Sequence, residues 1–180
     1  MDNLFRGELV RLAAVDPQPA AEAFSRWSSD SEYWRLMSSD PTYPRSVKAA
    51  KEHLEKGLDK EIIKDYFFNI RTLQEDRLIG DVGLDGVDWR NGDAYVGIGL
   101  GDRKDWGKGY GTDAIRLILR FAFNELNLHR LSLTVFEYNL RAIRSYEKAG
   151  FVIEGHTRGF VHRDGRRWDM ICMGILRHDL

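Results

Sequence analysis

Glycine and lysine alternate in one short loop of the chain, and this spacing suits the binding of a phosphate group. The loop reads Trp106-Gly107-Lys108-Gly109-Tyr110-Gly111-Thr112, and the apolar spacing after it predicts a helix from Thr112 to about Asn124. The N-terminus of a helix presents unpaired backbone N–H groups and partial positive charge, which attract anions. Glycine at alternate positions lets such N–H groups converge on a ligand. The alternative is a tight connection that binds no ligand.

The two best-known phosphate-binding loops differ from this one. A P-loop has four residues between its first glycine and Gly-Lys, and serine or threonine follows the lysine. Here five residues separate Gly101 from Gly107, and Gly109 follows the lysine. The dinucleotide fingerprint Gly-x-Gly-x-x-Gly fails because its last position is Thr112. A nucleotide-binding regulatory module is therefore the weaker alternative.

The strand predicted before this loop has one face almost without side chains. Residues 94–101 alternate between apolar side chains and, on the opposite face, Tyr95 followed by Gly97, Gly99 and Gly101. Glycine inside a strand often marks a place where a ligand or another segment approaches the backbone closely. We expect this glycine face to be open to a ligand.

Hydrophobic periods along the rest of the chain predict a mixed α/β domain. The turn signals Asn91-Gly92 and Asp164-Gly165 indicate two hairpins. The predicted order is a strand, helices, three strands, a helix, a strand, a helix and two strands. The predicted elements are a strand at 9–12, helices at 18–27 and 46–58 with a broken helix and a loop at 28–44 between them, strands at 66–71, 77–84, 94–101 and 131–136, a helix at 139–149 and two final strands.

Composition argues against several classes of protein. With 43% hydrophobic and 31% charged residues, the chain predicts one soluble domain over residues 1–180. The net charge of -1 argues against nucleic-acid binding, and the lack of a long apolar stretch argues against a membrane span. Cys172 is the only cysteine and the five histidines lack metal-ligand spacing, so no disulfide framework and no metal are expected. No signal peptide is visible, and we expect a cytoplasmic protein.

At two separate places the chain resembles the GNAT family of acetyltransferases. Residues Trp106–Ala114 are similar to motif A of that family, in the form typical of its ribosomal-protein (RimJ/RimL-like) branch. Residues Asn139–Phe151 resemble motif B, and residues Glu154–Gly174 resemble the C-terminal strands. The resemblance covers residues 65–178 well and residues 7–60 loosely. It implies a GNAT-like α/β fold, in which helices flank a central, mostly antiparallel twisted sheet that is splayed at the cofactor strand.

The resemblance also implies that acetyl-CoA is the acetyl donor and that a primary amine, of a small molecule or of a peptide N-terminus, is the acceptor. In such enzymes the pyrophosphate lies on the motif A amides, and the pantetheine arm runs beside the preceding strand. The asparagine of motif B, here Asn139, contacts the cofactor near the pantetheine, and the tyrosine, here Tyr146, is the general acid for the departing thiolate. The implied cofactor-binding residues are Ile98, Gly99, Leu100, Trp106, Gly107, Lys108, Gly109, Tyr110, Gly111, Thr112, Asn139, Ala142 and Tyr146.

Acyl transfer from a thioester also needs a donor to the carbonyl oxygen and a base for the incoming ammonium. A backbone N–H at Gly99 or Leu100 is the candidate donor to the acetyl carbonyl. Asp81 is the candidate base, acting directly or through water, and Asp85 lies near it in the same predicted strand. The alternative is that both acids belong to a hairpin and a solvated face.

Aromatic and acidic residues mark a candidate site for the acceptor. Tyr33 and Trp34, together with Asp85, would favour a cationic amine through cation–π and charge contacts. The alternative is that these aromatic residues plug the sheet. Relatives are often monomers or dimers, so a monomer or a homodimer is expected.

Two residues depart from the family pattern. Trp106 stands where motif A usually begins with arginine or glutamine, and Tyr95 stands where the branch often has a glutamate. These departures are the basis of a second hypothesis, in which the chain is a non-catalytic sensor or regulatory module that binds acyl-CoA. Cofactor binding without turnover would favour that hypothesis over an N-acetyltransferase.

Overall fold

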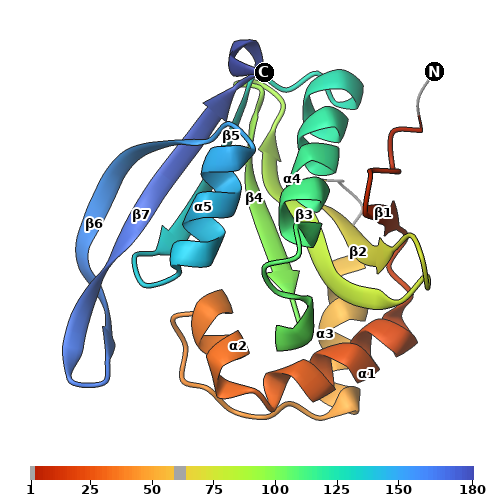
Figure 1. Ribbon diagram of the computed structural model, residues 1–180, viewed down its shortest axis with the longest axis vertical. Coiled ribbons are helices and arrows are strands. Elements are labelled where there is room, and N and C mark those ends of the chain that lie inside the picture. Colours follow the sequence, from red (N-terminus) through yellow and green to blue (C-terminus); the bar gives the residue numbers. More distant parts are fainter. Residues whose placement is uncertain (1–2, 59–63) are drawn as a thin grey trace.

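Seven strands form one sheet in the computed structural model, which describes residues 3–58 and 64–180 (Figure 1). The strands lie in the order β1-β2-β3-β4-β5-β7-β6, and neighbouring strands are antiparallel except for β4 and β5. The predicted mixed α/β fold with a mostly antiparallel sheet is confirmed. The strands are β1 (Val10–Ala13), β2 (Tyr66–Thr72), β3 (Leu78–Asp88), β4 (Asp93–Leu100), β5 (Arg130–Phe136), β6 (Val152–Arg163) and β7 (Arg166–Leu176).

The parallel pair of strands separates after a short contact. β4 pairs with β5 only over Asp93–Tyr95 and Arg130–Ser132, within the part of the chain that the structure describes. Beyond Tyr95, β4 stays paired with β3 on its other side as far as Leu100. The two strands therefore diverge toward the C-terminal end of β4, which is the splay that the resemblance to the GNAT family implies.

Helices flank the sheet in two groups (Figure 1). Helices α1, α2 and α3 gather at the end of the sheet where β4 finishes, and α4 and α5 lie together on one face. Local sequence sets several of their boundaries. Proline occupies the first turn of α1, and Asp30 caps α2 by accepting a hydrogen bond from the backbone N–H of Glu32 at 3.0 Å. The helices are α1 (Pro17–Ser28), α2 (Ser31–Met37), α3 (Val47–Leu58), α4 (Tyr110–Arg120) and α5 (Leu140–Lys148).

Several boundaries differ from those predicted, and the largest differences lie at α4 and at the end of β3. Helix α4 begins at Tyr110 rather than Thr112, because Gly109 takes a φ of +88° and turns the chain into the helix two residues earlier. The α-helix also ends at Arg120, and a π-helical turn over Phe121–Glu125 completes the predicted length. Strand β3 continues past residue 84 to Asp88, where the predicted hairpin leads into β4.

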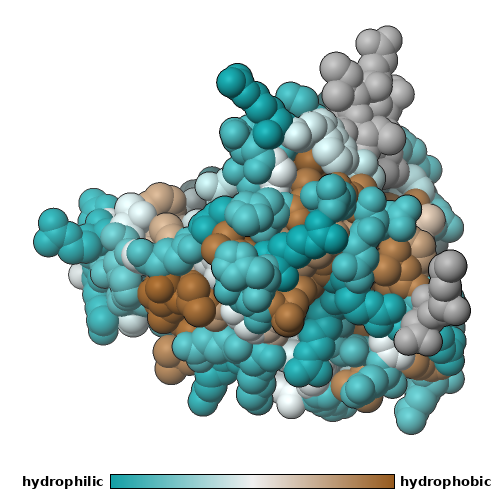
Figure 2. Space-filling view, turned by 90° about the horizontal axis from the view of Figure 1, so that it is seen from above, coloured by the Kyte–Doolittle hydropathy of each residue, from teal (hydrophilic) through white to brown (hydrophobic). Residues whose placement is uncertain are grey.

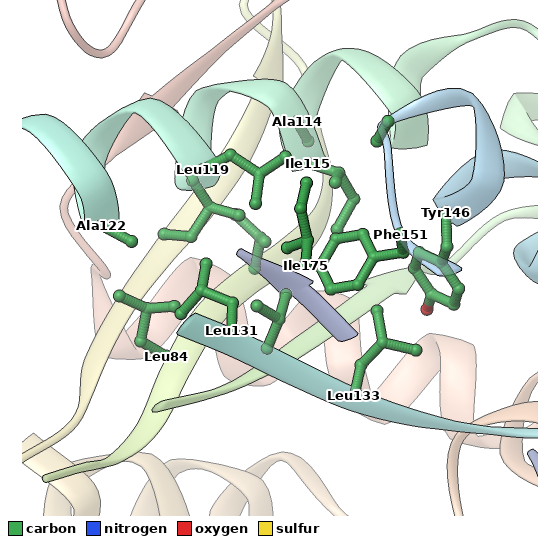
Figure 3. Packing of buried hydrophobic residues seen from close by; sticks show 14 of the residues in the cluster. Leu84, Ala114, Ile115, Leu119, Ala122, Leu131, Leu133, Tyr146, Phe151 and Ile175 are labelled. Carbon is green, nitrogen blue, oxygen red and sulfur yellow. The ribbon is translucent and has the colours of Figure 1, made fainter. Parts of the chain in front are cut away.

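The main core lies between α4 and the sheet (Figure 3). Ile115 and Leu119 of α4 point toward Leu84, Leu131 and Ile175 on three different strands, and all five side chains are buried. Burying an aliphatic side chain of this size contributes about 1.5–3 kcal/mol. The core therefore fixes α4, and with it the glycine loop, against β4. Hydrophilic residues cover most of the face seen from above, where apolar residues show in patches (Figure 2).

Candidate active site between β4 and β5

A cleft of about 670 Å³ opens where β4 and β5 separate. Its walls come from α2, β4, the loop at 106–112, β5 and α5. The predicted site residues that line it are Tyr33, Asp85, Ile98, Leu100, Trp106, Gly107, Gly109, Gly111, Thr112, Asn139, Ala142 and Tyr146. The predicted site residues outside its lining are Trp34, Asp81, Gly99, Lys108 and Tyr110.

The glycine loop enters α4 with two residues in the left-handed region. Gly107 has a φ of +74° and Gly109 a φ of +88°, conformations that a residue with a Cβ rarely adopts. A Cβ at Gly107 would meet no atom within 4 Å, so the space beside the loop is open. The backbone at the start of α4 therefore borders the cleft with room for an anionic group.

A buried ion pair holds the loop from behind. Asp105 is fully buried, and both of its carboxylate oxygens accept hydrogen bonds from Arg77, at 2.7 and 2.8 Å. These bonds hold the pKa of the Asp105 carboxyl below its usual range, and desolvation by burial opposes them. Because Arg77 neutralises Asp105, the positive charge of Lys108 and of the helix start is not cancelled there.

Trp106 ties the end of β4 to α5. The backbone N–H of Gly101 donates to the carbonyl of Ile79, so the alternation of an antiparallel pair directs the N–H and C=O of Leu100 away from β3. The indole N–H of Trp106 donates to that Leu100 carbonyl at 2.8 Å. The Arg141 guanidinium lies 3.7 Å from the centroid of the indole ring. The N–H of Leu100 thus points toward the splayed side, whereas Gly99 faces β3.

Several cleft residues have no counterpart in the sequence-based prediction. Basic side chains of α5 line the cleft at spacings of three and four residues, and Met37 lines it from α2. The sequence carries a signal for these basic residues, because side chains spaced three and four positions apart in the helix predicted at 139–149 share one helix face. Met37 lies in the loosely matched region and carried no such signal. The basic residues are Arg141, Arg144 and Lys148.

Tyr146 lies on α5 at the inner end of the cleft. Its ring is buried and meets Phe151 edge to face, with centroids 6.1 Å apart (Figure 3). Burial raises the pKa of the Tyr146 hydroxyl to about 12, so the group keeps its proton at neutral pH. Asn139 begins the same helix, and its side-chain oxygen accepts a hydrogen bond from the Ala142 N–H at 3.2 Å.

The glycine face of β4 is open at only one of its three glycines. At Gly97 the nearest atom to an added Cβ is a carboxylate oxygen of Asp85, 3.9 Å away. At Gly99 the thioether of Met37 covers the backbone, and at Gly101 an added Cβ would overlap the Trp27 indole. The prediction of an open face is therefore wrong at Gly99, which Met37 covers, and at Gly101, where glycine makes room for a tryptophan rather than for a ligand.

Asp81 is the partner of Gly99 across the β3–β4 ladder, and its side chain lies beside Gly99 on the same face of the sheet. A carboxylate oxygen of Asp81 is 3.5 Å from the position of a Cβ on Gly99, and burial raises the pKa of this carboxyl to about 6. Burial, followed by the charge of Asp81, raises the pKa of the Tyr33 hydroxyl well above its usual value. Asp85 is exposed and pairs with Tyr95 at the outer end of β4.

Trp34 does not share the cleft with the other predicted acceptor residues. It is 6% exposed and packs in a small aromatic cluster with Trp27 and Tyr33. The Arg45 guanidinium lies 4.6 Å from the centroid of its ring. The prediction that Trp34 contacts the acceptor therefore gives way to the alternative, in which the aromatic ring packs beside the sheet.

Salt bridges connect both ends of helix α2, which forms one wall of the cleft, to neighbouring segments. Arg103 donates to both carboxylate oxygens of Asp30, each at 2.6 Å, which ties the start of α2 to the segment after β4. Arg35 donates to both oxygens of Asp164 at 3.0 and 2.9 Å, and Arg163 donates to the backbone carbonyl of Arg35. The hairpin of β6 and β7 thus holds the other end of α2.

Comparison with known proteins agrees with this geometry. A model of the acetyltransferase (GNAT) domain matches residues 10–152 of the chain. The chain is 32% identical to the SPbeta prophage-derived uncharacterized N-acetyltransferase YokL of Bacillus subtilis, over 96% of this chain and 93% of that protein. It is 31% identical to the probable N-acetyltransferase YjcK of the same organism, over 98% of both chains.

Solved structures share the architecture of the chain. The spermidine N-acetyltransferase of Vibrio cholerae, in complex with CoA and spermine, superposes with a TM-score of 0.82 and 25% identity. The match covers 94% of this chain and 96% of that one. Fold and cleft together define an N-acetyltransferase that transfers an acetyl group from acetyl-CoA to an amine. The chain belongs to the GNAT family of acetyltransferases.

Among the described residues, no helix has both the length and the apolar character needed to cross a membrane. The same residues contain no group of three or more histidine, cysteine, aspartate or glutamate side chains placed to hold a metal ion.

Proposed function

We propose that this acetyltransferase acts on a small primary amine, with Tyr146 as general acid and Asp81 as general base. One observation carries the proposal: a single cleft joins the glycine loop, the diverging end of β4 and the buried Tyr146. The likeness to a spermidine acetyltransferase structure supports a small amine over a peptide as acceptor. Motifs A and B support the RimJ/RimL-like branch, which is a grouping by sequence.

The residues of the cleft suit acetyl-CoA, which supplies an activated acetyl group. Backbone amides of Gly107–Thr112 would hold the pyrophosphate, since the loop has open space and the positive end of α4. The edge of β4 from Ile98 to Leu100 would pair with the pantetheine, since β5 has diverged there. Lys108, Asn139 and Ala142 complete the proposed contacts, together with Trp106, Tyr110 and Tyr146.

Two side chains would carry out the proton transfers, and one backbone N–H would bind the acetyl carbonyl. The Leu100 N–H, which points toward the splayed side, would donate to the acetyl carbonyl. An acceptor ammonium has a pKa near that of lysine, about 10.4, so a base must remove a proton before attack. Asp81 is ionised at neutral pH and would take that proton directly or through water. Tyr146 keeps its proton and would give it to the departing thiolate.

A thiol-release assay tests the proposal directly. The protein is mixed with acetyl-CoA and 1,4-diaminobutane, and separately with peptides that have a free N-terminus. We expect release of CoA thiol with the diamine at a kcat/KM at least about tenfold above that with the peptides, which corresponds to about 1.4 kcal/mol. Preference for the peptides would overturn the small-amine proposal. Calorimetric binding of acetyl-CoA without turnover of any amine would instead favour the acyl-CoA sensor.

Substitution of Tyr146 tests its role as acid. Tyr146→Phe should lower kcat by about 100-fold, the lower range for general acid catalysis, with an unchanged Kd for acetyl-CoA. Tyr43→Phe is the matched control, since Tyr43 is 53% exposed and outside the cleft lining. Equal turnover by the two variants would remove Tyr146 from the acid role.

We also propose that residues 1–180 form a single domain that acts in the cytoplasm as a monomer or homodimer. One continuous sheet that takes in strands from β1 to β7 supports a single domain. Sedimentation of the purified protein and limited proteolysis test the oligomeric state and the domain boundary.

A further inference from the structure

The glycine face of β4 forms a groove that is closed at one end. Successive residues on one face of a strand are about 6.6–6.8 Å apart, so Gly97, Gly99 and Gly101 mark three steps along the strand. Gly97 is exposed, Gly99 is covered by the Met37 thioether, and the Trp27 indole fills the space at Gly101. A molecule that approaches Gly99 along this face must therefore come from the Gly97 end.

The wall of the groove is a helix with one adaptable side chain. Tyr33, Leu36 and Met37 of α2 line the same cleft as Gly97. Ion pairs connect the start of α2 to Arg103, and Arg35 near its end to Asp164. Met37 ends the helix, is 39% exposed and has three rotatable side-chain bonds.

Acidic side chains lie along the glycine face of β4, whereas the basic residues that line the cleft come from α5. Asp85 lies beside Gly97, and Asp81 lies beside Gly99 on the same face as the Met37 thioether. The Met37 methyl carbon is 2.9 Å from the position of a Cβ on Gly99, and its sulfur is 3.3 Å away. The space left over Gly99 therefore depends on where this one thioether lies.

We propose that Met37 determines acceptor specificity by admitting amines on an unbranched methylene arm and excluding amines whose nitrogen-bearing carbon is branched. The inference rests on the proposed function, because it assumes that the acceptor nitrogen meets the acetyl group beside Gly99 and Leu100. The Met37 thioether already fills the space over Gly99, so any arm that reaches this residue must turn the thioether aside, and an unbranched methylene arm requires the smaller displacement. A methyl branch next to the nitrogen meets the thioether, and a peptide N-terminus other than glycine carries such a branch.

A matched pair of diamines tests this proposal. The two substrates are 1,4-diaminobutane and 2,5-diaminohexane, which differ by one methyl on each nitrogen-bearing carbon. A single methyl group changes discrimination by about 10–200-fold, so the wild-type protein should prefer the unbranched diamine by at least about tenfold in kcat/KM. Met37→Ala should reduce that preference at least about fivefold, mostly by faster turnover of the branched diamine, with an unchanged KM for acetyl-CoA.

Leu36→Ala is the control, because it shortens a neighbouring cleft residue that does not cover Gly99. It should leave the preference unchanged. A preference that Met37→Ala does not alter, or that Leu36→Ala alters equally, would overturn the inference while the proposed function stands. Lack of turnover of either diamine by the wild-type protein would instead overturn the proposed function, and the inference with it.

A double substitution gives a second, independent measurement. Gly99→Ala should slow turnover of 1,4-diaminobutane, because its Cβ would lie 2.9 Å from the Met37 methyl carbon. Adding Met37→Ala should restore at least about half of the lost kcat/KM. A merely structural effect of Gly99→Ala predicts no such rescue, and its absence would count against a groove controlled by Met37.

Discussion

Asp113 joins the start of α4 to the N-terminal segment, and its removal should destabilise the protein measurably. The side chain is 8% exposed and accepts hydrogen bonds from the backbone N–H groups of Leu9 at 2.8 Å, Val10 at 3.0 Å and Glu8 at 3.3 Å. Gly7 passes directly over the carboxylate, where a Cβ would overlap it. Asp113→Ala removes all of these acceptors and leaves the shape of α4 otherwise unchanged.

The loss in free energy of unfolding follows from the individual hydrogen bonds that Asp113 accepts. A hydrogen bond to a charged group contributes about 1.5–3 kcal/mol, so the two shorter bonds set an upper range of about 3–6 kcal/mol. Leu9 is 41% exposed and Glu8 is exposed, so water can satisfy their N–H groups in the variant. Val10 is fully buried, and its N–H would be left without a partner. We therefore expect Asp113→Ala to lower the free energy of unfolding by about 3 kcal/mol.

Urea unfolding followed by circular dichroism measures this loss. At this chain length, about 3 kcal/mol corresponds to a fall in Tm of about 6–12 °C. Asp113→Asn keeps one oxygen acceptor and should lose about half as much. Asp40→Ala, at an exposed position, is the control and should change the free energy by less than about 0.5 kcal/mol. A loss below about 1 kcal/mol for Asp113→Ala would refute the assignment of these bonds to stability.

Three further predictions concern the loop and the base. Asp81 can accept a proton only when ionised, so kcat/KM should fall about tenfold per pH unit below its pKa of about 6. A pH–rate profile of Asp81→Asn should lack that step, and an unchanged profile would exclude Asp81 as base. Arg77 holds the pKa of Asp105 below its usual range, so this pair stabilises the fold above that range and the contribution is lost as the pH falls through the lowered pKa. Asp105→Asn should therefore cost about 3 kcal/mol at pH 7 and less at pH 3, measured by urea unfolding, whereas an equal cost at both pH values would contradict the ion pair. Trp106→Phe keeps the ring under Arg141 but removes the N–H to Leu100, and calorimetry should show about 3–10-fold weaker acetyl-CoA binding. Tighter or equal binding would show that this hydrogen bond does not shape the cofactor edge of β4.

The order of the elements could be predicted because its signals are local. Period, caps and turn residues act over a few positions, as at Asp164-Gly165 or at the Asn139 cap of α5. The start of α4 lies two residues before the predicted Thr112, because Gly109 turns the chain into the helix. Such a boundary depends on one φ angle, which glycine leaves free.

The parts of the site that are formed by contiguous residues of one motif could be predicted from the sequence. The loop at 106–112 and Tyr146 line one cleft, as expected of two motifs separated in sequence. The role of Gly101 could not be predicted, because it depends on Trp27, which packs against it from a distant part of the chain. The sequence left two roles open for Trp34, and the structure places its ring in a cluster with Trp27 and Tyr33. A glycine that admits a ligand and one that admits an indole look alike in sequence.

The short ladder between β4 and β5 divides the hydrogen bonding of the sheet into two parts. The four strands before it and the three after it are joined in the sheet by a ladder of just three residue pairs within the described chain. The cleft is lined by residues of both β4 and β5, so a ligand bound there would contact both strands and connect them where, in the described chain, no ladder does. Amide hydrogen exchange along β4 and β5 should therefore slow when acetyl-CoA binds.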